Sequence, residues 1–280
     1  MSEEGTEQTH ALPAYAQMMA DYHEAFADEL DGVIDALGVD PGSSVVDLAC
    51  GDGAYTKRLA RRVGDSGVVL ALDLSSAFLD RARSGLEEDA LRDRTRFVQM
   101  DVEHSPVVEG NADLVWCAQS LYSLPDPSSA VRRMAALARP GGRIAVFESD
   151  EFHHVTLPWP VELEMALRRE ELRAFEERSD RPEKYYIARD LPRIFREAGL
   201  PGCAFLSFAF SRRAPFDRPT RGFLAAYLAD LDKRVAHRLA EADRREFQAL
   251  VDPASPRHIL DDADSLVVCV DHLAIATRPD

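Results

Sequence analysis

The segment from Ser44 to Thr56, with the sequence SVVDLACGDGAYT, constrains the fold more than any other part of the chain. Its apolar first half is typical of a buried strand in a parallel sheet. Its second half is a turn of small residues, in which Gly51 and Gly53 let the backbone pass close to a ligand where a Cβ atom would clash. A strand, a small-residue turn and a helix start, in this order, predict a loop that holds an adenosine-type cofactor.

The spacing of the glycines separates two kinds of cofactor loop. A dinucleotide-binding loop has the pattern G-x-G-x-x-G, which places the pyrophosphate on the N-terminus of the following helix. Here Asp52 stands inside the turn, between Gly51 and Gly53, and its charge would repel a pyrophosphate. The turn therefore disfavours a nicotinamide dinucleotide. An ordinary strand, turn and helix without a ligand is the simpler alternative for so short a pattern.

Two further apolar segments also end in an acid. VVLALDL ends near Asp73, and TRFVQMDV ends near Asp101. Asp73 follows the glycine turn by about 20 residues, which is where an acid binds the two hydroxyls of a ribose. Ser75 or Ser76 can cap the next helix, and this leaves Asp73 free for a ligand. Together with Asp47, these acids mark the ends of successive strands behind one glycine turn, which favours a ligand site over an ordinary turn.

The pattern D-x-A-C-G-D-G, followed later by L-A-R-P-G-G at residues 137–142, resembles the class I methyltransferases that use S-adenosylmethionine. The resemblance covers residues 15–202 and, more loosely, the last apolar segments. It implies an α/β fold, Rossmann-like, in which a seven-stranded, mostly parallel sheet has helices on both faces and helical lid elements.

The chain of 280 residues has no repeat and no low-complexity linker, so we expect one core with inserted lids. The expected parts are an N-terminal helical lid over 1–40, a cofactor-binding core over 41–150, a lid insertion over 151–185, a core helix and strand six over 186–214, a helical lid insertion over 215–264, and the last core strand over 265–280.

The resemblance implies S-adenosyl-L-methionine as the cofactor and S-adenosyl-L-homocysteine as its product. Asp73 would bind the ribose, Asp101 would accept a hydrogen bond from the adenine amino group, and Val102 would pack on the adenine ring. The expected cofactor-binding residues are Tyr22, Asp47, Ala49, Gly51, Gly53, Asp73, Leu74, Asp101, Val102 and Cys117.

Methyl transfer from a sulfonium is an in-line displacement, so the protein mainly aligns the reactants and excludes water. A base is needed where the acceptor arrives protonated, and histidine has a suitable pKa. His153, His154 and Tyr122 follow predicted strands and are the expected catalytic residues. The expected acceptor contacts are Tyr15, Gln119, Tyr122, Phe152, Trp159 and Tyr186. A metal site is not expected, because adjacent histidines diverge in an extended segment.

The charge and the cysteines limit the partners and the location. A formal net charge of -16 disfavours nucleic acid as a substrate, and we expect a small organic acceptor of secondary metabolism. The four cysteines are far apart in the sequence, so we expect them to be free thiols in a reducing compartment. The N-terminus lacks a signal-peptide core, and no apolar run approaches the length of a membrane span, so we expect a cytoplasmic protein. The oligomeric state stays open, with a homodimer as one alternative.

The competing interpretation of function is a protein of the same fold that binds the cofactor without transferring its methyl group, such as a cyclase or a decarboxylating enzyme. Asp73 is present at the expected position, which favours methyl transfer. Whether oxygen, nitrogen or carbon is methylated stays open at this point.

Overall fold

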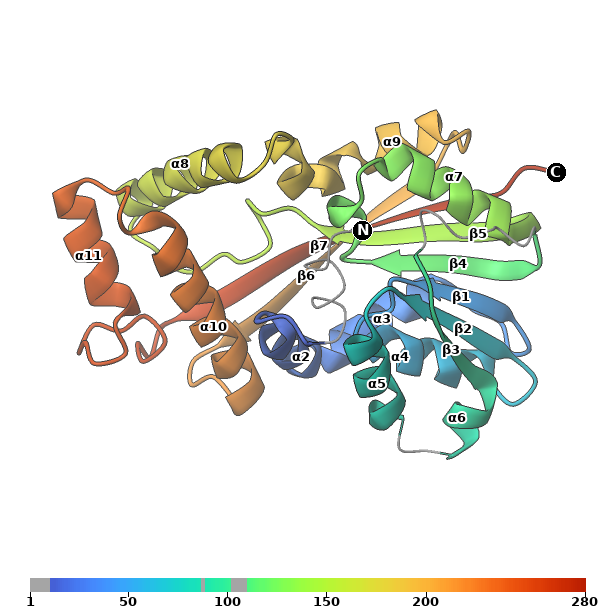
Figure 1. Ribbon diagram of the computed structural model, residues 1–280. Coiled ribbons are helices and arrows are strands. Elements are labelled where there is room, and N and C mark those ends of the chain that lie inside the picture. Colours follow the sequence, from blue (N-terminus) through green and yellow to red (C-terminus); the bar gives the residue numbers. More distant parts are fainter. Residues whose placement is uncertain (1–10, 87–88, 102–109) are drawn as a thin grey trace.

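The computed structural model describes residues 11–86, 89–101 and 110–280. A seven-stranded sheet with the order β3-β2-β1-β4-β5-β7-β6 forms its centre (Figure 1). β1 to β5 pair in parallel, whereas β7 runs antiparallel to both β5 and β6. The predicted seven-stranded, mostly parallel α/β fold is therefore confirmed. The strands are β1 (Ser44–Leu48), β2 (Val68–Asp73), β3 (Thr95–Gln99), β4 (Ala112–Ala118), β5 (Ala138–Ser149), β6 (Ala204–Arg213) and β7 (Leu266–Thr277).

Helices cover both faces of the sheet, with α7 and α9 on one face and α3 and α4 on the other (Figure 1). Two short 3-10 helices, η1 (Leu121–Ser123) and η2 (Pro182–Asp190), lie in the connections. The α-helices are α2 (Ala16–Ala25), α3 (Ala27–Ala36), α4 (Ala54–Val63), α5 (Ser76–Gly85), α6 (Asp89–Arg94), α7 (Pro127–Leu137), α8 (Val161–Arg178), α9 (Leu191–Glu197), α10 (Arg218–Val235) and α11 (Glu241–Val251).

The central strands are buried on both faces because their side chains alternate between two cores. Val45 and Trp116 pack with the core that includes α3 and α4, whereas Val46 and Cys117 pack with the core that includes α7 and α9. This alternation follows from the two-residue period of a strand, and it explains why β1 and β4 are almost uninterrupted apolar runs.

β1 and β4 are neighbours in the sheet, but the helices that follow them lie on opposite faces. In open α/β sheets such a reversal leaves a crevice outside the carboxyl ends of the strands, where ligands bind. The polypeptide therefore places the glycine turn after β1 and the segment after β4 on either side of this crevice.

The helices of the expected lid segments gather beyond the carboxyl ends of the strands. α2 contacts α10, and α10 contacts α8 and α11 (Figure 1). Phe26, Leu167, Phe223 and Phe247, from the three segments 1–40, 151–185 and 215–264, are buried in the same core. α2 and the helices of both insertions thus pack together, whereas α3 covers a face of the sheet.

The segment 186–214, expected to hold a core helix and strand six, contains α9 and β6. Residues up to Asp190 form η2, and the α-helix α9 begins at Leu191 with Pro192 in its first turn. Proline is well tolerated there because the first N–H groups of a helix have no partner within the helix. α9 contacts α7 and β7, and β6 is the outer strand of the sheet.

Gly67 offers a test of the packing between α4 and β2. A Cβ atom at Gly67 would lie 2.4 Å from Val63 Cβ and 2.8 Å from the Ser43 carbonyl oxygen, so Gly67→Ala should lower the free energy of unfolding by about 1–3 kcal/mol. Gly32 in α3 has open space around it, and Gly32→Ala should raise that free energy by about 0.5–1 kcal/mol. Urea denaturation measures both, and equal effects of the two changes would contradict this packing.

Candidate functional site

The crevice is bounded by two strained backbone positions. Ala49, just after β1, has a φ of 57°, and Gln119, just after β4, has a φ of 49°. A residue with a side chain pays about 1–2 kcal/mol in this left-handed region, and such strain is concentrated at ligand sites. Gly51 and Gly53, at 54° and 78°, continue the turn without that cost. Because β1 and β4 are paired up to Leu48 and Cys117, Ala49, Gly51 and Gln119 follow the carboxyl ends of two neighbouring strands.

Asp73, at the end of β2, holds the glycine turn. Its Oδ2 atom accepts a hydrogen bond from the Gly51 N–H at 2.8 Å, and its Oδ1 atom accepts one from the Ser75 N–H at 2.8 Å. Ser75 caps α5 as predicted by accepting the Phe78 N–H, but Asp73 is not left free. Burial raises the pKa of Asp73, although both N–H groups act to lower it. A carboxylate has about four acceptor positions, so these contacts leave acceptor capacity for a ligand.

Two of the expected cofactor-binding residues lie beneath the crevice rather than at its surface. Asp47 is buried and accepts a hydrogen bond from the Thr56 hydroxyl at 2.5 Å, which ties β1 to the first turn of α4. Burial raises the pKa of Asp47 to about 7. Cys117 is fully buried in the core shared with α7, and burial raises its pKa. Both residues support the walls of the site from below.

α2 lies against the turn from the lid side. A Cβ atom at Gly51 would lie 3.6 Å from Met19 Cε, so α2 limits the space above the glycine. Tyr15, at the start of this helix, stands half exposed with its ring 6.4 Å from that of Phe78. Burial and the nearby charge of Asp73 both raise the pKa of Tyr15. α2 therefore brings a tyrosine toward the acid that holds the turn.

The remaining expected cofactor contacts lie at the ends of β2 and β3. Leu74 follows Asp73 and is 53% exposed. Asp101 comes shortly after β3, which ends at Gln99, and it makes an interaction within the protein. Val102 lies outside the described residues. The ends of β2 and β3 pair with each other, so Leu74 and Asp101 border the same side of the crevice.

Asp271 on β7 is a functional candidate that the sequence analysis missed. It is fully buried and accepts hydrogen bonds from the Tyr22 and Ser149 hydroxyls, both at 2.5 Å. His154 Nδ1 lies 3.5 Å from Asp271 Oδ1. Burial raises the pKa of Asp271, but His154 and the two hydroxyls lower it more, so that it stays below its usual value. An acid within the apolar run SLVVCVDHLAIAT was the signal for this residue.

His154 and its neighbour His153 have different surroundings. Burial acts to lower the pKa of His154, but Asp271 raises it more, and the net pKa lies above the usual value. His153 is exposed, and its Nδ1 atom lies 3.8 Å from Asp150 Oδ1. The structure therefore separates the two adjacent histidines, and it is His154 that faces the buried acid on β7.

Glu148, at the end of β5, is a second buried acid that the sequence analysis missed. Its Oε1 atom accepts hydrogen bonds from the N–H groups of Ser120 and Leu121, at 2.9 and 2.5 Å. Burial raises the pKa of Glu148 to about 8. These contacts fix the segment after β4 that carries Gln119 and Tyr122. Tyr122 is partly buried, and burial, with the charge of Glu148 among the smaller causes, raises its pKa.

Three expected acceptor contacts are already engaged with other side chains. Phe152 and Tyr186 stack on each other with ring centroids 4.8 Å apart, and Arg189 lies over both rings. Arg189 is held in turn by the buried Asp150, with an Nε–Oδ2 distance of 2.6 Å. Trp159 is buried, and its ring packs 5.9 Å from that of Phe247 in α11. Phe152 and Tyr186 thus form one stacked aromatic pair. Trp159 lies in the apolar core between the segment after β5 and α11.

Within residues 11–86, 89–101 and 110–280, no group of three or more histidine, cysteine or acidic side chains is arranged to hold a metal ion. In the same described residues, every helix is too short or too polar to cross a bilayer.

Residues 45–142 match the model of a methyltransferase domain family. The chain is 38% identical over 115 residues to the ubiquinone/menaquinone biosynthesis C-methyltransferase UbiE of Hahella chejuensis. The matched region covers 41% of this chain and 46% of that protein. The chain thus spans about half the length of the curated relatives that it matches.

Two solved structures share the fold over most of the chain. A protein of Bacillus halodurans C-125, described as a methyltransferase, has a TM-score of 0.56 and 16% identity, and the match covers 89% of this chain and 99% of that one. The cyclase SpnF has a TM-score of 0.51 and 22% identity, and the match covers 90% of this chain and 82% of SpnF.

Glu148 should make stability depend on pH. Its pKa of about 8 in the folded state lies above the usual value near 4.3, so the native state keeps a proton that the unfolded chain releases. The free energy of unfolding should therefore fall as pH rises from about 5 to 8, by at most about 1.4 kcal/mol per pH unit from this group. Glu148→Gln should make this fall smaller, while the exposed Glu176→Gln should not. Denaturation series at several pH values measure the slopes, and equal slopes for wild type and Glu148→Gln would contradict the assignment.

Proposed function

Because the chain carries a class I S-adenosylmethionine-dependent methyltransferase domain, we propose that it transfers a methyl group from S-adenosyl-L-methionine to a small organic acceptor. The observation that carries this proposal is the glycine turn, held by Asp73 beside the strained positions Ala49 and Gln119. These features lie together at the point where the strand order reverses, which is where the fold binds ligands.

The residues around the turn fit the cofactor. Asp73 keeps acceptor positions for the two ribose hydroxyls after it has bound the N–H groups of Gly51 and Ser75. Gly51 adopts a positive φ of 54° that strains any residue with a side chain, and Gly53 packs so closely on Ala82 that a Cβ atom would lie 2.8 Å from Ala82 Cβ, so both glycines fix the backbone of the turn. When bound, the cofactor supplies an electrophilic methyl group on a sulfonium. Leu74 and Asp101 would border its adenosine.

On the acceptor side, His154 is our candidate for a general base. Its Nδ1 atom faces Asp271, which leaves Nε2 as the ring nitrogen that takes a proton from an acceptor hydroxyl. Asp271 would orient the imidazole and stabilise its protonated form. Gln119 and Tyr122, on the segment fixed by Glu148, would contact the acceptor. A protonated acceptor, such as a phenol or an alcohol, suits this arrangement best.

The nature of the acceptor follows from charge and from the lid. A net charge of -16 opposes a nucleic acid substrate, and the helices beyond the carboxyl ends of the strands would enclose a small molecule. We propose an acceptor of secondary metabolism, and a cytoplasmic location. SpnF shows that a cyclase shares the fold, and formation of S-adenosyl-L-homocysteine separates methyl transfer from a cyclase reaction.

Asp73→Ala should weaken the binding of S-adenosyl-L-homocysteine at least tenfold. Charge-assisted hydrogen bonds to the ribose, and the contact that holds the Gly51 N–H, together contribute about 1.5–3 kcal/mol. Isothermal titration calorimetry measures the affinity, and circular dichroism checks that the variant is folded. Asp80→Ala, an exposed change on α5, is the matched control and should bind normally. Unchanged affinity in folded Asp73→Ala would remove Asp73 from the site.

His154→Ala should lower turnover by a factor of about 10² to 10⁴ with a hydroxyl acceptor, while cofactor affinity stays nearly unchanged. The base must be neutral, so turnover should rise with pH as His154 loses its proton, at a pH above its usual value near 6.5. Asp271→Asn removes the charge that raises this pKa, so the rise should move to lower pH. Product formation is measured from pH 5 to 9 with a panel of phenols and alcohols. His153→Ala is the control, and near-native turnover of His154→Ala would favour an amine or an already deprotonated acceptor.

A further inference from the structure

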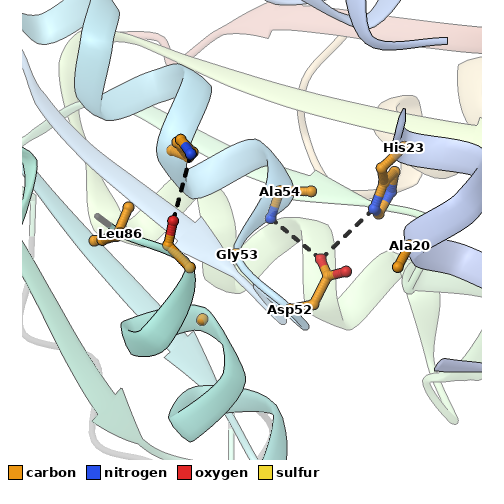
Figure 2. Close-up of a pocket in the computed structure, with 9 residues that line it drawn as sticks. Ala20, His23, Asp52, Gly53, Ala54 and Leu86 are labelled. Carbon is orange, nitrogen blue, oxygen red and sulfur yellow. Dashed lines mark hydrogen bonds and ion pairs between the residues drawn. The ribbon is translucent and has the colours of Figure 1, made fainter. Parts of the chain in front are cut away.

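A cavity of about 180 Å³ lies between α2, the start of α4 and the C-terminal half of α5 (Figure 2). It borders the glycine turn through Asp52 and Gly53, whereas Ala49, Gly51, Asp73 and Gln119 are not among its lining residues. Its lining consists of Ala20, His23, Asp52, Gly53, Ala54, Lys57, Ala82, Gly85 and Leu86. The proposed contacts to the ribose, through Asp73, and to the acceptor, through His154, Gln119 and Tyr122, lie outside this lining.

Opposite charges line two sides of the cavity. Asp52 Oδ1 accepts the Ala54 N–H at 3.2 Å and lies 3.6 Å from His23 Nδ1 (Figure 2). Burial raises the pKa of Asp52, but His23 and the Ala54 N–H lower it more, so the carboxylate is charged at neutral pH. Lys57 Nζ contacts the Gly85 carbonyl oxygen at 3.4 Å on the other side. The cavity thus presents one negative and one positive group.

The buried side chain of His23, which lines the cavity, lacks hydrogen-bond partners among the described residues. Its side chain is 92% buried, and both of its ring nitrogens lack a hydrogen-bond partner among the described residues. The contact with Asp52, at 3.6 Å, is too long to count as a hydrogen bond. Buried polar atoms are nearly always paired, and leaving one unpaired is costly. A polar group in the cavity, next to Asp52, would satisfy one of these nitrogens.

We propose that this cavity binds a small α-amino acid, with its ammonium group between Asp52 and His23 and its carboxylate on Lys57. An ammonium group donates to the Asp52 carboxylate and to the imidazole nitrogen that carries no proton. The volume of about 180 Å³ is well above the ~10–15 Å³ that one water needs on the same measure, so the cavity has room for a small amino acid such as alanine. Ala20, Ala82 and Leu86 supply an apolar wall for a short aliphatic side chain.

A ligand with both charges fits better than one with a single charge. An amine alone would leave Lys57 unmatched, and a simple anion would be repelled by Asp52. The aminocarboxylate group of S-adenosyl-L-methionine has the same chemistry. The separation of the cavity from Gly51 and Asp73 favours a free amino acid, and the experiment distinguishes the two sources.

The test is a titration of the full-length protein with L-alanine, followed by the backbone amide signals of Gly53, Ala54 and Gly85 in NMR spectra. Saturable shifts of these signals are expected, with ethylammonium and acetate binding at least tenfold more weakly. Saturating S-adenosyl-L-homocysteine should not displace alanine. Absence of saturable shifts, equal binding of ethylammonium or acetate, or displacement by S-adenosyl-L-homocysteine would overturn the proposal.

Two variants assign the charges. Asp52→Asn keeps an oxygen that accepts the Ala54 N–H, and Lys57→Met keeps a long apolar side chain, so both should fold. Each should weaken alanine binding at least about tenfold, since each loses one charge-assisted contact. Asp80→Asn, on the exposed side of α5, should bind as the wild type does. Wild-type affinity in both charge variants would show that alanine binds elsewhere.

Discussion

The buried carboxylate of Asp271 on β7 requires two distant segments, α2 and the end of β5 with the loop after it, to meet β7 at one point. A charge in an apolar interior is tolerated only when hydrogen bonds and an opposite charge compensate it. Here the compensation comes from Tyr22 on α2, from Ser149 at the end of β5 and from His154 in the loop beyond it. The position of α2 relative to the sheet therefore depends on Asp271, a residue of β7.

Two other acids, near the ends of β2 and β5, bind main-chain groups of neighbouring segments. Asp73, at the end of β2, holds the glycine turn by the Gly51 N–H, and Glu148, at the end of β5, holds the segment after β4 by two N–H groups. In each case an acid on one strand fixes the backbone that follows a neighbouring strand. The walls of the crevice are thus set by carboxylate contacts to the main chain. Side chains in these segments could change without loss of the backbone geometry.

The sequence predicted the strands, the glycine turn and Asp73, because these depend on local spacing along the chain. It did not predict that Asp73 binds the Gly51 N–H, since that contact follows from the pairing of β1 with β2. Asp271 and Glu148 were missed because an acid inside an apolar segment looks like an interruption of a strand. Trp159 was expected beside the acceptor, but it packs on Phe247, a partner that only the tertiary fold brings near.

One face of α2 contacts the glycine turn, the buried Asp271 and the small cavity beside Asp52. Met19 lies over Gly51, Tyr22 binds Asp271, and His23 lies beside Asp52. Residues three and four apart share a side of a helix, so these contacts belong to one surface. A shift of α2 would change three contacts together. These are the contact with the glycine turn, the hydrogen bond from Tyr22 to Asp271 and one wall of the small cavity. The packing of α2 against α10 ties that surface to the lid. The backbone of the glycine turn and the packing of α10 are therefore linked through α2, the element that contacts both.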